Sequence, residues 1–138
     1  MIERSPFVAS LLADAIQRAQ QSSVELFHSD FSLHQGQSIQ LIEHLSQQQQ
    51  PDIIYLDPMF PPKSKSAAVK KEMRLVKLLV GADPDADELL PVALNHAKYR
   101  VVVKRPSYAP YLNEQKPSMS IESKGNRFDV YVLSSPSL

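Results

Sequence analysis

The chain has 138 residues, a formal net charge of zero and no cysteine, so it can bury one modest core but cannot form disulfides or a thiolate metal site. No apolar run approaches the roughly 20 residues that a membrane helix needs, and the first residues show no secretory leader pattern. We therefore expect a single domain over residues 1–138 that lies in the cytoplasm and has no membrane partner.

The zero net charge hides an uneven distribution along the chain. Residues 1–62 contain two basic and seven acidic side chains, a net charge of −5, whereas residues 63–138 contain thirteen basic and eight acidic ones, a net charge of +5. A basic half on a neutral protein is typical of a surface that faces a polyanion, although solvated lysines on ordinary helices can give a similar count.

The first third of the chain predicts alternating strands and helices. Ser5 followed by Pro6 is a good helix start, because a capping hydroxyl precedes a proline in the first turn. Apolar residues then recur at helical spacing. We predict, in chain order, the end of a strand at 1–3, a helix at 5–19, a strand at 24–28 and a helix at 39–45 that fades into the glutamine run 47–50.

The run from Asp52 to Asp57 is the most informative segment. Its apolar centre is bounded by prolines on both sides, and its length suits a parallel strand that is covered on both faces. Asp57 would then stand at the carboxyl end of this strand, where open α/β sheets place their ligands.

The rest of the chain completes an α/β order. We predict a helix at 66–80 that Gly81 stops, a helix at 84–97, a strand at 99–103, and strands at 119–122 and 128–133 that flank Lys124-Gly125-Asn126 as a hairpin. This order fits a mostly parallel sheet with an antiparallel end. The three glycines form no glycine-rich turn that could approach a cofactor, so we expect the first βα unit of such a fold to be missing.

Several motifs resemble one known family. Asp57-Pro58-Met59-Phe60 resembles the Asp/Asn-Pro-Pro-Phe/Tyr loop of S-adenosylmethionine-dependent methyltransferases that modify exocyclic amines. Further motifs follow in order: Lys70-Lys71-Glu72-Met73-Arg74, Leu79-Val80-Gly81, Val101-Val102-Val103-Lys104-Arg105-Pro106, Tyr108-Ala109-Pro110, Lys124-Gly125 and Arg127-Phe128-Asp129. Together they resemble the RsmJ family of small-subunit ribosomal RNA guanine-N2 methyltransferases, from Glu3 to about Tyr131. The resemblance implies a class I, Rossmann-like methyltransferase fold without the family's amino-terminal portion.

The resemblance also implies a cofactor, S-adenosylmethionine, with S-adenosylhomocysteine as the product and no metal. Its binding residues would be Glu3, Arg4, Asp30, Phe31 and Asp57. Glu3 would accept hydrogen bonds from the ribose hydroxyls, while Asp30 and Phe31 would address the edge and the face of the adenine. Taken alone, Glu3 is equally a solvated carboxylate, and Asp30 equally caps a turn.

The catalytic candidates are Asp57, Pro58, Met59 and Phe60. The Asp57 carboxylate and the Pro58 carbonyl could orient a planar NH2 group, and Phe60 offers a stacking face for a base swung out of its helix. Because a sulfonium methyl is already activated, no strong general base is needed. The structural alternative is an ordinary Asp-Pro turn with a core phenylalanine.

Basic and aromatic residues predict contact with RNA. We expect the partner to be small-subunit ribosomal RNA or the small ribosomal subunit, bound by a monomer, because several basic groups follow strand ends at one edge of the sheet. The candidate residues are Lys63, Lys65, Lys70, Lys71, Arg74, Lys104, Arg105, Tyr108, Lys124 and Arg127.

Two alternative functions remain open. Without a glycine-rich turn the chain could be a catalytically silent RNA-binding piece. The loop at Asp57 also suits an amine methyltransferase acting on DNA adenine or protein glutamine, although the basic half of the chain speaks against a protein acceptor.

Overall fold

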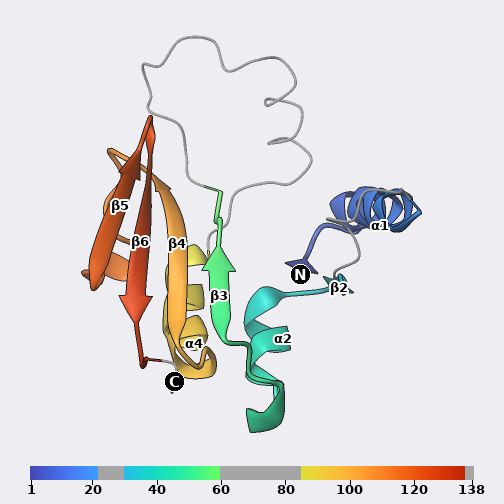
Figure 1. Cartoon of the computed structure of the whole chain (residues 1–138), viewed down its shortest axis with the longest axis horizontal. Coiled ribbons are helices and arrows are strands. Elements are labelled where there is room, and N and C mark those ends of the chain that lie inside the picture. The colour runs from blue at the N-terminus through green and yellow to red at the C-terminus, as the bar shows by residue number, and fades with distance from the viewer. Residues whose placement is uncertain (22–29, 60–84, 136–138) are drawn as a thin grey trace. The chain divides into compact units, whose positions relative to one another are not determined.

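The computed structural model describes residues 1–21, 30–59 and 85–135. The chain divides into two compact units, Met1–Leu41 and Ile42–Leu138, which Figure 1 shows with their helices and strands labelled. The predicted strand at 24–28 and helix at 66–80 lie outside the described residues. None of the helices within the described ranges is long and apolar enough to cross a membrane.

The first unit contains the helix predicted from the capping pattern. Helix α1 (Pro6–Gln20) begins with proline at its first position, and the Ser5 hydroxyl accepts a hydrogen bond from the Val8 backbone N–H at 3.4 Å. Strand β1 (Ile2–Glu3) precedes it and pairs in parallel with β2 (His34–Gln35). The strand end at 1–3 is thus confirmed, whereas β2, two exposed polar residues, has no apolar alternation that could have predicted it.

Helix α2 (Ser38–Glu43) overlaps the helix predicted at 39–45; it begins one residue earlier and ends two residues earlier. The glutamine run that follows forms a separate 3-10 helix, η2 (Gln47–Gln49). Ser46 begins it, and the Gln49 side-chain oxygen accepts hydrogen bonds from the Ser46 backbone N–H at 3.1 Å and from its hydroxyl at 2.8 Å. This run is therefore a capped helical turn at the surface.

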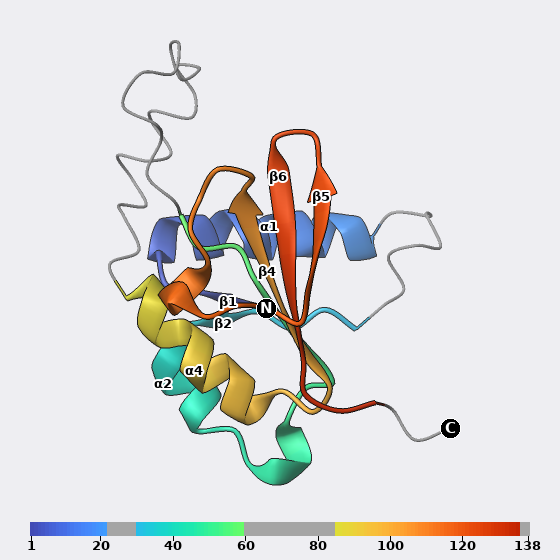
Figure 2. The same ribbon diagram turned by 90° about the vertical axis from the view of Figure 1, so that its left-hand side faces the viewer.

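The second unit is built on a four-stranded mixed sheet. Its strands lie in the order β3 (Ile53–Leu56), β4 (Arg100–Pro106), β6 (Asn126–Val132) and β5 (Met119–Ser123), as Figure 1 shows. Strands β3 and β4 are parallel, and β6 runs antiparallel to both of its neighbours. The predicted hairpin is confirmed as β5 and β6, joined by a tight turn (Figure 2).

One face of this sheet carries the core. Helix α4 (Ala86–His96) lies against β4 and packs on the 3-10 helix η3 (Leu112–Glu114). Leu90 of α4, Leu112 of η3, and Val101 and Val103 of β4 are almost completely buried. Alternate residues of a strand point to opposite faces, so β4 contributes every second side chain to this core. Two short elements therefore stabilise the sheet from one side.

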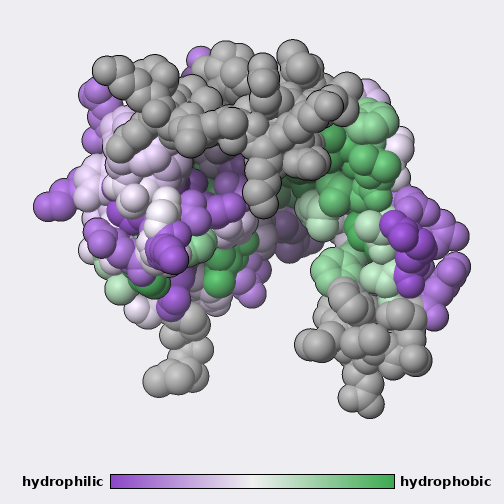
Figure 3. Space-filling model, turned by 90° about the horizontal axis from the view of Figure 1, so that it is seen from above, coloured by the Kyte–Doolittle hydropathy of each residue, from purple (hydrophilic) through white to green (hydrophobic). Residues whose placement is uncertain are grey.

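The opposite face of the sheet is exposed, so the prediction that the β3 segment is covered on both sides is wrong. Ile53 and Tyr55 are 53% and 54% exposed, whereas Ile54 and Leu56 are buried. Met119 and Ile121 of β5 are also half exposed, and their register with β6 places them on the same face as Ile53 and Tyr55. Hydrophobic residues are also exposed elsewhere, as on the surface of the first unit at the right of Figure 3. The apolar run is thus an alternating, half-buried strand in this chain.

Candidate functional site

The carboxyl ends of β3 and β4 bring two charged side chains together. The strands are parallel, and the last pair in their register is Leu56 opposite Val103. Asp57 and Lys104 come next on each strand. The Lys104 ammonium donates a hydrogen bond to Asp57 Oδ2 at 2.8 Å. The sheet register therefore produces an ion pair at the edge where the sequence places the ligand site.

This pair lies at the surface. The side chains of Lys104 and Asp57 are 35% and 51% exposed. The hydrogen bond to Asp57, followed by the attraction between the two charges, raises the pKa of Lys104 above its usual value. Ion pairs this exposed contribute about 0–1 kcal/mol to stability. The pair therefore adds little to the stability of the fold.

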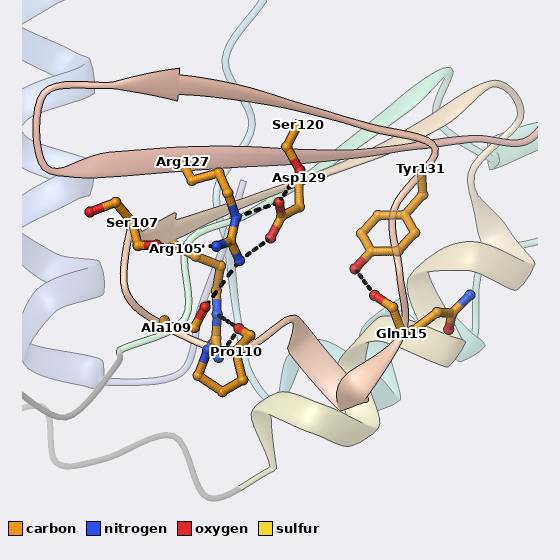
Figure 4. A network of polar contacts seen from close by, with 9 residues as sticks. All are labelled: Arg105, Ser107, Ala109, Pro110, Gln115, Ser120, Arg127, Asp129 and Tyr131. Atoms are coloured by element: carbon orange, nitrogen blue, oxygen red, sulfur yellow. Dashed lines mark hydrogen bonds and ion pairs between the residues drawn. The ribbon is translucent and has the colours of Figure 1, made fainter.

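The segment that follows β4 is held by a polar network under the sheet (Figure 4). Asp129 of β6 is fully buried and accepts a hydrogen bond from the Ser120 hydroxyl at 2.7 Å. Arg127 donates to Asp129 at 2.7 and 2.9 Å, and also to the carbonyl oxygens of Ser107 and Ala109. This network ties the backbone after β4 to the antiparallel hairpin.

Sequence reasoning missed Asp129 as a structural residue. The available signal was a basic and an acidic residue two apart, Arg127 and Asp129, in a strand whose later residues are otherwise apolar. Residues two apart in a strand share a face. The hydrogen bond to Asp129 raises the pKa of Arg127, which also lies over the Tyr111 ring at 4.7 Å.

Two of the arginines that were predicted to bind RNA make their contacts inside the protein instead. Arg105 is 4% exposed and donates from Nε and Nη2 to the Pro110 carbonyl oxygen at 3.2 and 3.1 Å, and burial lowers its pKa. The Arg127 side chain is 12% exposed. Both lie on the covered face of the sheet, opposite to Lys104, because strand residues alternate. Their positions correct the expectation that these guanidinium groups meet RNA.

The other predicted acceptor and RNA residues fall into two groups. Tyr108 is half exposed after β4, and Lys124 is exposed in the turn between β5 and β6. Pro58 and Met59 are partly buried directly after Asp57. Outside the described residues lie Phe60, Lys63, Lys65, Lys70, Lys71 and Arg74.

The predicted cofactor residues other than Asp57 belong to the first unit. Glu3 ends the parallel strand β1, and its Oε1 accepts a hydrogen bond from the Ser5 backbone N–H at 2.7 Å. Arg4 follows it, and Asp30 and Phe31 precede β2, with Phe31 41% exposed. A carboxylate at the end of a parallel strand has the chemistry to bind ribose hydroxyls. Glu3 thus fits the adenosine part of a nucleotide cofactor, and it also fixes the start of α1.

The comparisons with known proteins identify the family of the chain. A family model described as "Putative SAM-dependent methyltransferase" matches residues 1–133. A Tolumonas auensis protein named ribosomal RNA small subunit methyltransferase J is 59% identical over 137 residues, which cover 97% of this chain and 54% of that protein. An Aeromonas salmonicida protein of the same name is 57% identical and covers 96% of this chain and 53% of its own length. The chain spans about half the length of these relatives.

A solved structure supports the fold. A SAM-dependent methyltransferase from Neisseria gonorrhoeae matches with a TM-score of 0.73 and 38% identity, over 95% of this chain and 50% of that one. The mixed sheet and its hairpin therefore belong to a class I methyltransferase fold, as the sequence predicts. With the family model matching nearly the whole chain, the chain belongs to the SAM-dependent methyltransferase family, and its resemblance to the RsmJ family is confirmed by relatives that carry that name.

Proposed function

We propose that the chain contributes the acceptor-binding part of an enzyme that transfers a methyl group from S-adenosylmethionine to the exocyclic N2 of a guanine in small-subunit ribosomal RNA. The observation that carries this proposal is the half-exposed carboxylate of Asp57 at the carboxyl end of β3, directly before Pro58 and Met59. The names of the relatives support RNA as the acceptor.

Asp57 would act by orienting the target amine. An ionised carboxylate only accepts hydrogen bonds, and an NH2 group is a donor, so Asp57 can hold one N–H while the nitrogen lone pair faces the methyl group. S-adenosylmethionine supplies a methyl group that its sulfonium already activates. The proton released after transfer can pass to Asp57 or to water. Alignment of this kind lowers barriers by up to about 7–11 kcal/mol in favourable intramolecular cases.

The adenosine part of the cofactor would contact Glu3, Arg4, Asp30 and Phe31, with Asp57 shared between the donor and the acceptor. This division fits the residues present, because the carboxylates and the phenylalanine suit a ribose and an adenine. The methionine end of the cofactor has no glycine-rich turn in this sequence to receive it.

The RNA surface that we propose includes Tyr108 and Lys124 among the described residues, together with Lys63, Lys65, Lys70, Lys71 and Arg74. Tyr108 can stack on an unpaired base, and the lysines can neutralise phosphates. The enzyme would act as a monomer in the cytoplasm, where it would meet the small ribosomal subunit.

A second candidate is a catalytically silent RNA-binding piece. It is favoured by one observation, that the three glycines of this sequence form no glycine-rich turn for the cofactor. Isothermal titration separates the two functions. Micromolar binding of S-adenosylmethionine supports the enzyme, whereas binding of small-subunit ribosomal RNA without any cofactor binding supports the silent piece. Absence of both would contradict each proposal.

Acceptor specificity needs a separate assay. The chain is incubated with labelled S-adenosylmethionine and, in parallel, with unmodified small-subunit ribosomal RNA, DNA or protein. Label in the N2-methylguanine of the RNA supports the proposal. Label in DNA adenine or protein glutamine would instead support a different amine methyltransferase.

A further inference from the structure

The Lys104 side chain meets Asp57, although its position after β4 had suggested a phosphate contact. Its ammonium lies 2.8 Å from Asp57 Oδ2. We propose that Lys104 is a positioning residue that holds the Asp57 carboxylate in the orientation that the target amine requires. This inference rests on the proposed function of Asp57.

The sheet holds the backbone of Lys104 in place. Strand β4 is an interior strand, paired with β3 on one side and β6 on the other. Val103, the preceding residue, is fully buried. Asp57 follows the last residue of β3, where the ladder with β4 ends. A short acidic side chain at such a position can rotate about its Cα–Cβ bond, and a donor on the adjacent strand selects one rotamer.

The Lys104 ammonium and the Asp57 carboxylate have different roles, because one donates hydrogen bonds and the other accepts them. A lysine ammonium and a base amine are both donors, so Lys104 cannot itself hold the target NH2. The ammonium occupies Oδ2, and the described residues give Oδ1 of Asp57 no hydrogen-bond partner. That second oxygen is therefore the acceptor available to the amine. The amine nitrogen becomes positive as the methyl group arrives, so a nearby ammonium helps by geometry and not by charge.

The same two strands provide a matched control at their other end. Lys98 Nζ lies 3.4 Å from Asp52 Oδ1, and their side chains are 42% and 66% exposed. Lys98 precedes β4 and Asp52 precedes β3, so this pair links the amino ends of the strands. It has the same residue types and similar exposure, but it lies at the edge away from Asp57. Lys98→Met therefore reports what the loss of a strand-linking ion pair does by itself.

The first test reads the Asp57 rotamer in the full chain by NMR, from three-bond couplings to its β-hydrogens. We expect one dominant rotamer in the unchanged chain and in Lys98→Met, and averaged couplings in Lys104→Met. Lys104→Arg should retain one rotamer, because guanidinium can also donate to the carboxylate. Unchanged couplings in Lys104→Met would overturn the inference, whether or not the chain is an enzyme.

The second test measures methyl transfer to small-subunit ribosomal RNA. Lys104→Met should lower kcat about tenfold to a hundredfold, because small misplacements of a reacting group cost that much, while KM for RNA changes less than about twofold. Lys98→Met should change neither. A higher KM with unchanged kcat would show that Lys104 contacts phosphate, and would overturn the inference. If neither the unchanged chain nor any variant transfers methyl but the Asp57 couplings respond to Lys104→Met, the proposed function fails, and what remains is that Lys104 orients the Asp57 carboxylate.

Discussion

Arg127 and Asp129 lie two residues apart on the covered face of β6 and share two hydrogen bonds, of 2.7 and 2.9 Å. Asp129 is completely buried, and the Arg127 side chain is 12% exposed. The pair also holds the backbone after β4 through the carbonyl oxygens of Ser107 and Ala109. The segment that follows β4 is therefore anchored by a charge pair and not by apolar packing alone.

Removing Asp129 should destabilise the chain strongly. Asp129→Ala leaves the buried Arg127 guanidinium without its carboxylate, and breaking one side of a buried pair costs about 3–5 kcal/mol. Urea unfolding measures the change. Asp14→Ala is the control, because its ion pair with Arg18 is 61–72% exposed and should cost less than about 0.5 kcal/mol. Equal costs for the two variants would contradict the structural role of Asp129.

Tyr131 should make stability depend on alkaline pH. Its hydroxyl donates to the Gln115 carbonyl oxygen at 2.8 Å, and burial raises its pKa to about 12. Because the folded pKa lies above the unfolded value of about 10, the contribution of Tyr131 is complete below pH 10 and is lost as the pH rises toward 12. The loss is at most about 3 kcal/mol.

Comparison with Tyr131→Phe isolates this contribution. The free energy of unfolding of both proteins is measured by urea titration between pH 9 and pH 12. Their difference should shrink across that interval, because only the unchanged chain has a phenol at position 131 to ionise, while the other four tyrosines are common to both proteins. A difference that stays constant with pH would rule out the buried phenol as the cause.

The backbone conformation of the hairpin turn should by itself require glycine at position 125. Its φ is +83°, a value that side chains disfavour, and an added Cβ would meet no atom within 4 Å. Gly125→Ala should therefore cost about 1 kcal/mol through backbone strain, while Lys124→Ala, the adjacent turn residue, should be nearly neutral. Thermal unfolding of the two variants compares them directly, and an equally stable Gly125→Ala would be inconsistent with the turn geometry.

Lys124 should contribute to RNA binding through phosphate alone. Lys124→Gln removes one charge from the hairpin turn, so the salt dependence of RNA affinity should weaken by about 0.7–0.9 in the log–log slope. Lys116→Gln, an exposed lysine before β5, serves as the matched control. The measurement is a binding titration at several salt concentrations. If Lys116→Gln changes the slope as much as Lys124→Gln does, RNA binding depends on diffuse charge and not on a defined contact at Lys124.

Local signals predicted several elements correctly. Ser5 and Pro6 predicted α1, because capping acts within one turn. Lys124-Gly125-Asn126 predicted the hairpin, because a positive φ in the turn selects glycine. The placement of Asp57 at a strand end also followed from the boundaries of the apolar run. These features depend on neighbours within a few residues, so a single sequence contains them.

The contacts that could not be predicted are non-local. The partner of Lys104 is 47 residues away along the chain, and it follows from the register of two strands. The burial of Arg105 depends on which face α4 covers, since Lys104 beside it points to the other face. Ile53 and Tyr55 look like core residues by composition, and only the sheet shows that their face is exposed.

The most direct test of the central claim is the rate of labelled methyl transfer from S-adenosylmethionine to unmodified small-subunit ribosomal RNA by the chain and by Asp57→Ala. Asp52→Ala, at the opposite end of β3, is the control. We predict that Asp57→Ala lowers the rate about a hundredfold or more without loss of fold, and that Asp52→Ala leaves it unchanged. Equal rates for the unchanged chain and Asp57→Ala, or no transfer by the unchanged chain, would contradict the role assigned to this carboxylate.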